Sequence, residues 1–264
     1  MINILNTLNN YEPISTEIKF LPKSLIRLSV LKTLYEFPMN MKDINEKTKL
    51  NYSAISNTIH TLELAGHIYF ENNCYFLSNS MRICIGNILK LGSLMILLDE
   101  ISPITQNHVV NELTFDSIYD FHYLKNINLI ESDGLNVYKT YEIIEKSIMD
   151  SEYVHAILPF SYNDFNDRFN KLLKKNICVE LISPLNIKNN ILKRINSSND
   201  NFTINFFDFD GINAFLLVCT DKKMMLGFFK DDGSYDQNRL LTSTDDDCIK
   251  WANNLFESFK KENI

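Results

Sequence analysis

The sequence predicts an α+β protein of two domains, with three short helices and a β-hairpin first and an α/β domain with a mixed, partly parallel sheet last. Helical periodicity runs from residue 23 to residue 66, and two β-prone runs follow at once. After residue 141, strands alternate with helices of about ten to fifteen residues. A length of 264 residues suffices for two hydrophobic cores. We expect domains at 1–80 and 141–264, joined by linker or dimerisation helices at 81–140.

The first two helices are predicted from apolar spacing and from a helix-breaking residue. Between residues 25 and 34 the apolar side chains recur at helical intervals, and Pro38 ends the pattern because its ring cannot continue a helix. A second, short helix is expected at 41–48, where it turns Ile44 inward. The pair therefore predicts two packed helices joined by a tight turn.

The third predicted helix, residues 52–65, has two different faces. Asn51 is placed to cap its start and Gly66 to end it. The face predicted to be buried carries aliphatic residues at i, i+4 and i+7, namely Ile55, Ile59 and Leu62. The other face carries short, mostly uncharged hydrogen-bonding groups, at Ser53, Ser56, Asn57 and His60. Such a face can approach a polyanion and bond to base edges, so we predict a DNA recognition helix.

Two β-prone runs follow, Ile68–Phe70 and Tyr75–Leu77, and the residues between them favour a tight turn. Asn72 and Asn73 tolerate the left-handed conformation that a two-residue hairpin needs. Three helices followed by such a β-ribbon form a winged helix-turn-helix, whose wing tip contacts the minor groove or phosphates. The alternative is a helical bundle with an appended hairpin and no role in DNA binding.

The charge distribution is uneven. The net charge of −7 argues against coating of nucleic acid by the whole surface. Residues 19–62, however, contain seven basic and three acidic residues. This excess has the sign that phosphate contacts require, and Lys42, Lys47 and Lys49 are the candidates.

The cysteines and the N-terminus favour a reducing, cytoplasmic location. Five cysteines are scattered, and no two form a C-x-x-C pair, so neither a zinc ribbon nor a disulfide scaffold is indicated. The polar, Asn-rich N-terminus does not resemble a signal peptide. The most apolar stretch, 83–101, is interrupted by Lys90, so we expect no membrane insertion.

The helix predicted at 83–101 is apolar nearly all round and must pack on several sides. A second copy of the chain is the simplest partner, because a homodimer places two recognition helices about one DNA turn (~34 Å) apart. The alternative is that the second domain alone covers this helix. Residues 102–137 are expected to form a connecting region with short helices.

The C-terminal segment 226–261 resembles that of archaeal winged-helix regulators with an ArsR-like winged helix, a family that includes the filament-associated regulators of methanogenesis. The resemblance rests on the run Asp232-Gly233-Ser234-Tyr235-Asp236 and on the helix from Lys250 to Phe256. Residues 23–68 fit the same family. The resemblance implies a transcription regulator whose second domain is sensory. The chain departs from its relatives at Asn57-Thr58, where they carry bulkier or basic residues.

The second domain also resembles one half of the phospholipase-D-like fold, whose enzymes use His-x-Lys-x4-Asp. The corresponding segment, 213–221, contains neither the histidine nor the lysine. The five histidines show no metal-ligand spacing, and no glycine-rich phosphate loop is present. We therefore predict no catalytic site, no metal site and no cofactor. An enzyme acting on phosphodiesters or lipids remains the alternative function.

A small-molecule effector is the remaining expected partner. Ligands of such sheets bind beyond the carboxyl ends of the parallel strands. The candidates there are Phe160, Ser161, Tyr162, Ser183 and Asp208, which would supply an apolar wall and polar groups. The alternative is that these are ordinary strand-to-helix turns.

The sequence thus predicts a dimeric, DNA-binding transcription regulator with a C-terminal sensory domain. A second alternative is an interaction module whose winged helix binds protein. The residues predicted to contact double-stranded DNA are Lys42, Lys47, Lys49, Ser53, Ala54, Ser56, Asn57, His60, Asn72 and Asn73.

Overall fold

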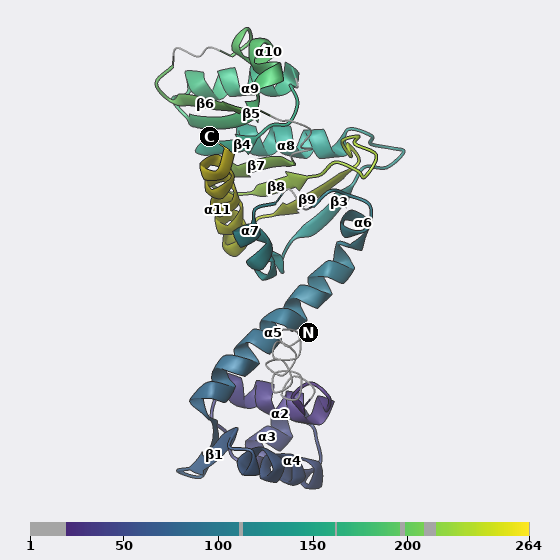
Figure 1. The fold of residues 1–264 in the computed structure, drawn as a ribbon, viewed down its shortest axis with the longest axis vertical. Coiled ribbons are helices and arrows are strands. Elements are labelled where there is room, and N and C mark those ends of the chain that lie inside the picture. Colours follow the sequence, from purple (N-terminus) through teal and green to yellow (C-terminus); the bar gives the residue numbers. More distant parts are fainter. Residues whose placement is uncertain (1–19, 111–112, 162, 196–198, 209–214, 264) are drawn as a thin grey trace, which may run out of the picture. The chain divides into compact units, whose positions relative to one another are not determined.

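The computed structural model forms two compact units, residues 1–92 and 93–264 (Figure 1). It describes residues 20–110, 113–161, 163–195, 199–208 and 215–263. Each unit has its own hydrophobic core. The division between the units falls between Gly92 and Ser93.

Three capped helices open the first unit. They are α2 (Leu25–Glu36), α3 (Met41–Thr48) and α4 (Tyr52–Leu64). In each case a polar side chain accepts the backbone N–H three residues further on, which satisfies one of the unpaired amides of the first turn. The capping side chains are those of Ser24, Asn40 and Asn51. The third helix begins where the Asn51 cap predicted it to begin.

A two-stranded antiparallel hairpin follows, with β1 at Ile68–Glu71 and β2 at Cys74–Leu77. Asn72 and Asn73 form the turn with φ angles of 48° and 61°. Two consecutive positive φ values match the right-handed twist of the strands, which is why asparagine is favoured at both positions. The first unit is therefore a winged helix-turn-helix, as predicted.

The core of the first unit lies between the three helices and the hairpin. Ile44 of α3 and the aliphatic face of α4 are at most 2% exposed. Met81 and Ile85, from the start of the next helix, pack into the same core. The aliphatic face of α4 thus anchors the helix to the unit, and its opposite face remains outside.

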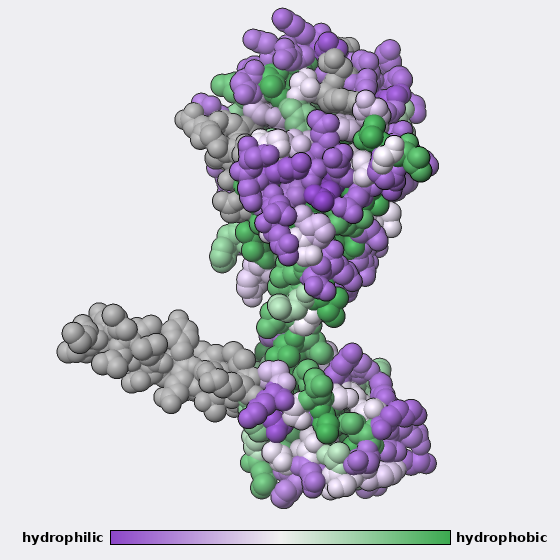
Figure 2. Space-filling model, turned by 90° about the vertical axis from the view of Figure 1, so that its right-hand side faces the viewer, coloured by the Kyte–Doolittle hydropathy of each residue, from purple (hydrophilic) through white to green (hydrophobic). Residues whose placement is uncertain are grey.

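The next helix, α5 (Asn79–Glu100), has 22 residues and is rich in apolar side chains. It is the one described helix long and apolar enough to cross a membrane by length and composition. Only 17% of an apolar 18-residue stretch of this helix is buried within the chain. Ile83, Leu91, Met95 and Ile96 are exposed large apolar side chains, and hydrophobic residues appear green along this helix in Figure 2.

The second unit is built on a seven-stranded sheet in the order β3-β9-β8-β7-β4-β5-β6. The pairs β4–β5 and β5–β6 are parallel, and the other four pairs are antiparallel. This is the mixed, partly parallel sheet that the alternation of strands and helices predicted. The strands are β3 (Asn128–Glu131), β4 (Tyr153–Ile157), β5 (Cys178–Pro184), β6 (Phe202–Phe207), β7 (Leu216–Thr220), β8 (Met224–Gly227) and β9 (Arg239–Ser243).

Helices cover both faces of this sheet. Successive strand residues point to opposite faces, so neighbouring residues of one strand pack with different helices. Val154 and Ala156 of β4 pack with one set of helices, whereas Ile157 packs with the other. The first set is α8 (Lys139–Met149), α9 (Asn163–Lys174), η2 (Leu185–Ile187) and α10 (Lys188–Leu192). The second set is α6 (Ser102–Thr105), α7 (Phe115–Tyr119), η1 (Phe121–Leu124) and α11 (Asp246–Asn263).

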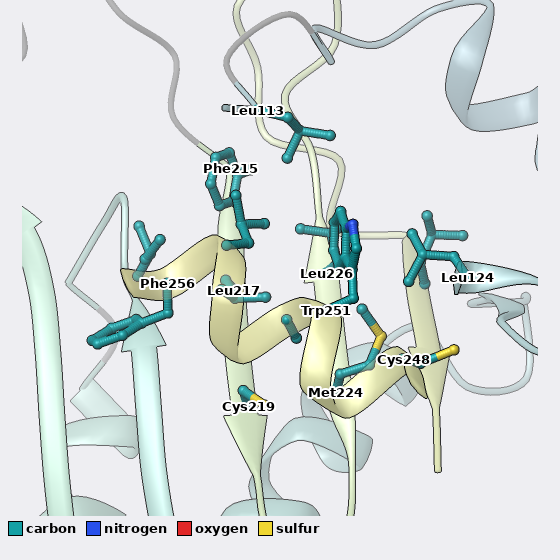
Figure 3. Packing of buried hydrophobic residues seen from close by; sticks show 14 of the residues in the cluster. Leu113, Leu124, Phe215, Leu217, Cys219, Met224, Leu226, Cys248, Trp251 and Phe256 are labelled. Atoms are coloured by element: carbon teal, nitrogen blue, oxygen red, sulfur yellow. The ribbon is translucent and has the colours of Figure 1, made fainter. Parts of the chain in front are cut away.

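Helix α11 supplies the aromatic centre of its layer. Figure 3 shows Trp251 of this helix beside Leu226 of β8, and Phe256 stacks on His155 of β4. Trp251 is 2% exposed, and its indole N–H donates to the carbonyl of Ser117 at 2.9 Å. As the only tryptophan of the chain, it reports on the integrity of the second unit.

Residues 93–140 contribute more to the second unit than a connecting region would. Their strand β3 pairs with β9, and neither strand was anticipated from the sequence. Both are only four or five residues long, and no clear alternation marks them. Leu97, Ile104 and Leu124 also enter the core beneath α11. The compact second unit therefore begins well before residue 141, where the sequence placed its start.

Candidate nucleic-acid interface

The polar face of α4 is exposed along its whole length. Ser53, Ser56, Asn57 and His60 are all exposed, and Ala54 between them is half-buried. In Figure 1, α4 lies along the lower edge of the first unit, with the hairpin at its left end. Since the opposite face is buried, this arrangement fixes the helix while leaving side chains of hydrogen-bonding type available at the surface.

The three lysines are all exposed, but two of them face carboxylates. Lys42 lies 3.9 Å from Glu46, one helical turn away. Lys47 forms an ion pair with Glu36, which is the largest cause of a lowered pKa at that carboxyl. Lys49 has no carboxylate partner among the described residues. Both pairs are solvent-exposed, so their interaction is weak enough for phosphates to compete.

The wing offers its asparagine tip and an aromatic surface. Asn72 and Asn73 are exposed. Behind them, Tyr69 stacks on Phe76 with ring centroids 5.3 Å apart, and Phe70 contacts Tyr75 at 4.8 Å. These cross-strand ring pairs stiffen a hairpin that two short strands would hold only weakly.

The predicted effector residues do not form one site. Ser183 is completely buried and donates its hydroxyl to the carbonyl of Leu158 at 3.1 Å, so that group is used inside the sheet. Asp208 is exposed beyond the end of β6, and Ser161 is half-buried. Tyr162 lies outside the described residues. Among the described candidates, Phe160 lines a hollow.

That hollow, of about 440 Å³, is lined by five aromatic residues and by Pro159 and Gln237. The rings come from segments far apart in the sequence, which is why no local pattern revealed them. None of the described residues that line the hollow is charged. The five aromatic residues are Tyr138, Tyr141, Phe160, Phe229 and Tyr235.

A buried polar cluster forms around Asp236, in the loop between β8 and β9 that also carries Phe229 and Tyr235. Asp236 accepts from the amide of Asn238 and from Arg239, and one of its oxygens lies 2.8 Å from His108. Burial opposes ionisation of this carboxyl, but the hydrogen bonds, that of His108 first, outweigh it and lower its pKa. The sequence gave no sign of this pairing, because 128 residues separate the two partners.

Within the described part of the chain, no three His, Cys, Asp or Glu side chains are grouped as metal ligands. His155 is half-buried, bonds through Nδ1 to Asn253 and stacks on Phe256. Burial raises the pKa of the Cys219 thiol to about 12. Residues 213 and 214, where the phospholipase-D-like motif would begin, lie outside the described residues.

Comparison with known proteins links the second unit to a regulator. Residues 137–262 match the family described as the middle domain of the methanogenesis regulatory protein FilR1. The match spans just under half of the chain and includes most of the sheet, α8 and α11. A search of curated proteins found no match.

Three solved structures align at low identity. TrmBL2, an archaeal chromatin protein, is 9% identical with a TM-score of 0.39, and the alignment covers 94% of this chain and 97% of that one. An IclR-family putative transcriptional regulator from Rhodococcus is 12% identical, with a TM-score of 0.21 and coverage of 89% and 90%. The PigF structure with SAH is 10% identical, with a TM-score of 0.25 and coverage of 77% and 66%. These scores are too low to support a functional argument.

Proposed function

We propose that the chain is a cytoplasmic transcription regulator that binds double-stranded DNA sequence-specifically through α4. The observation that carries this proposal is the division of α4 into a fully buried aliphatic face and an exposed face of short polar groups. A purely structural surface helix would carry long charged side chains instead. The match of the second unit to a domain of a regulatory protein supports the same conclusion.

In this proposal α4 enters the major groove. Asn57 reads a base edge, and a bidentate contact of its amide to adenine is the geometry that asparagine favours. Ser53, Ser56 and His60 contact neighbouring base edges or phosphates, and the half-buried Ala54 allows close approach. Lys49 binds phosphate directly, whereas Lys42 and Lys47 exchange their carboxylate partners for phosphates. Asn72 and Asn73 at the wing tip contact the minor groove or the backbone.

The homodimer is proposed to form along α5. Leu91 and Met95 lie one turn apart on one side of the helix, and Ile83 and Ile96 flank them on either side. Each of them is more than half exposed. A second copy that presents the same stripe would bury both sets of side chains in an isologous contact. The dimer would then present two copies of α4 to two half-sites.

DNA binding is tested with the full chain on duplexes selected from a random pool. We expect enrichment of a defined motif and an affinity that falls steeply as salt rises, because phosphate contacts release counterions. Lys49→Ala should reduce the slope of log affinity against log salt by about one. Failure to enrich any motif, or affinity independent of salt, would remove the proposal in favour of a winged helix that binds protein.

Base reading by Asn57 is tested with Asn57→Ala. We expect a loss of about 1–3 kcal/mol on the selected motif and little change on random DNA. Asn254→Ala, the same change at an exposed position of α11, serves as the control and should alter neither affinity. An equal loss on motif and random DNA would rule out a base-reading role for Asn57.

The dimer is tested by sedimentation equilibrium of Leu91→Glu. A carboxylate in the middle of the shared stripe should dissociate the dimer, because burying it without a partner is costly. Leu135→Glu is the matched control, since Leu135 is completely exposed in the second unit. A monomeric wild-type chain, or flotation of the wild-type chain with lipid vesicles, would contradict the dimer as the partner of α5.

A further inference from the structure

We propose that the aromatic hollow of the second unit is a binding site for a flat, uncharged aromatic molecule that carries a hydrogen-bond acceptor. This inference rests on the proposed regulatory function and names the ligand class of its sensory unit. The hollow's volume of about 440 Å³ lies within the range of small-molecule sites.

The wall of the hollow is preformed by three rings in contact. The ring of Tyr235 is tilted against that of Phe160 at 4.7 Å and meets the edge of Phe229 at 5.5 Å. The hydroxyl of Tyr235 lies where a side chain at residue 227 would be, and Gly227 leaves that space open. Because these rings hold one another, a ligand need not order them on binding.

The loop that carries Phe229 and Tyr235 is also held by its backbone. The amide of Lys230 donates to the carbonyl of Ser234 at 2.8 Å, and the amide of Gly233 donates back to Lys230 at 2.9 Å. Gly233 has a φ of 81°, which closes the turn. The aromatic wall is therefore set by the fold and not by a chance rotamer.

The chemistry of the lining selects the ligand class. Aromatic side chains prefer offset or edge-to-face contact with another ring, so a flat aromatic molecule gains more than a saturated one of equal size. A charged ligand would leave water without finding an opposite charge in the lining. The hydroxyl of Tyr138 and the amide of Gln237 can orient one polar group of the ligand.

A cation is the chief rival, because aromatic faces attract positive charge. The position of α8 disfavours it. Tyr138 precedes this helix and Tyr141 lies in its first turn, so its N-terminal, positive end adjoins the hollow. The cap residue provides no side-chain hydrogen bond to the first-turn amides, and the one acidic side chain of that turn, Glu142, bonds to Asn136 and does not line the hollow. A neutral ring with a nitrogen or carbonyl acceptor fits this end of the helix better than an ammonium group.

The test uses quinoline, cyclohexanol and tetramethylammonium as probes for the full chain, at pH 7.5 and without DNA. Saturation-transfer NMR titrations should show saturable binding of quinoline, at least tenfold tighter than either of the other probes. Cyclohexanol binding as well as quinoline would overturn the aromatic selectivity. Tighter binding of tetramethylammonium, or no saturable binding of quinoline, would overturn the proposal.

Two variants locate the site. Phe160→Ala and Tyr138→Ala should each weaken quinoline at least tenfold, and Tyr138 is 64% exposed, so its removal should leave the fold intact. Phe115→Ala is the control, because Phe115 is 80% exposed and does not line the hollow. Trp251 fluorescence verifies folding in each case. Equal quinoline binding by all three variants would place the ligand elsewhere and overturn the proposal, while leaving the DNA-binding results untouched.

Discussion

Nε2 of His108 lies 2.8 Å from a carboxylate oxygen of Asp236, and both side chains are at most 2% exposed. Nδ1 of the same ring lies 3.0 Å from the carbonyl of Ile104. Both ring nitrogens of His108 therefore lie within hydrogen-bond distance of an oxygen atom. The pair thus ties the loop between β8 and β9 to the segment that follows α5. Two backbone bonds, Val109 to Phe229 and Asp231 to Asn107, reinforce this connection.

Breaking this pair should destabilise the second unit strongly. His108→Ala leaves the buried Asp236 carboxylate without its main partner, and we expect a loss of about 3–5 kcal/mol in the free energy of unfolding. Urea titration followed by Trp251 fluorescence measures it. Lys125→Ala removes an exposed pair with Asp247 in the same unit and should cost no more than about 0.5 kcal/mol. Similar losses in both variants would show that the buried pair stabilises the fold no more than an exposed pair does.

The stability that Asp236 contributes should disappear in acid. Its pKa in the folded chain is lowered from the ordinary 3.8, so its carboxylate stabilises the fold above that value. This contribution is lost as the pH falls through the folded pKa. The difference in unfolding free energy between wild type and Asp236→Asn should therefore be constant above about pH 5 and shrink below about pH 4. A difference that stays constant down to pH 2 would contradict this assignment.

Gly227→Ala should disturb the aromatic wall. A Cβ atom there would lie 2.3 Å from the hydroxyl oxygen of Tyr235, so the ring must move. We expect a loss of about 1–3 kcal/mol, typical of overpacking, measured by urea titration with Trp251 fluorescence. Gly134→Ala is the control, because no atom lies within 4 Å of its added Cβ.

The clash at Gly227 can be separated from other effects with a double variant. Tyr235→Phe removes the hydroxyl that the new Cβ meets. The loss in Gly227→Ala/Tyr235→Phe should therefore be smaller than the sum of the two single losses. Simple additivity would show that the strain in Gly227→Ala does not come from Tyr235.

Removal of the Asn51 cap should loosen the start of α4. Its side chain accepts the Ala54 amide at 2.7 Å, and Asn51→Ala should cost about 1 kcal/mol, or roughly fivefold faster exchange of that amide with deuterium. The Asp43 amide, capped by Asn40, should be unaffected. Asn51→Asp retains a hydrogen-bond acceptor, so the Ala54 amide should exchange as slowly as in the wild type. Equal exchange in wild type and Asn51→Ala would show that the cap does not hold this turn.

The sequence could predict the elements whose causes are local. The Asn51 cap of α4 and the turn at Asn72-Asn73 depend on residues within three positions of one another, so their patterns are visible in the chain itself. The short strands β3 and β9 are stabilised by pairing across more than a hundred residues, which no local pattern records.

The candidate sites follow the same division. The exposed face of α4 could be predicted, because helical periodicity alone separates it from the buried face. The aromatic hollow and the His108–Asp236 pair could not, since both assemble from distant segments. At Ser183 the sequence suggested a ligand contact, because this residue follows a predicted strand. In the structure its hydroxyl instead bonds to the carbonyl of Leu158 within the sheet.

The pairing of β3 with β9 bears on how this protein can be dissected. A fragment that contains only residues 137–262, the span of the family match, would lack β3 and leave β9 as an unpaired edge strand. It would also lose Leu97, Ile104 and Leu124 from the core beneath α11, so part of that core would face water. An unpaired edge strand can pair with a strand of another chain, so such a fragment is expected to aggregate. An autonomous second unit has to retain the chain from residue 93 onward.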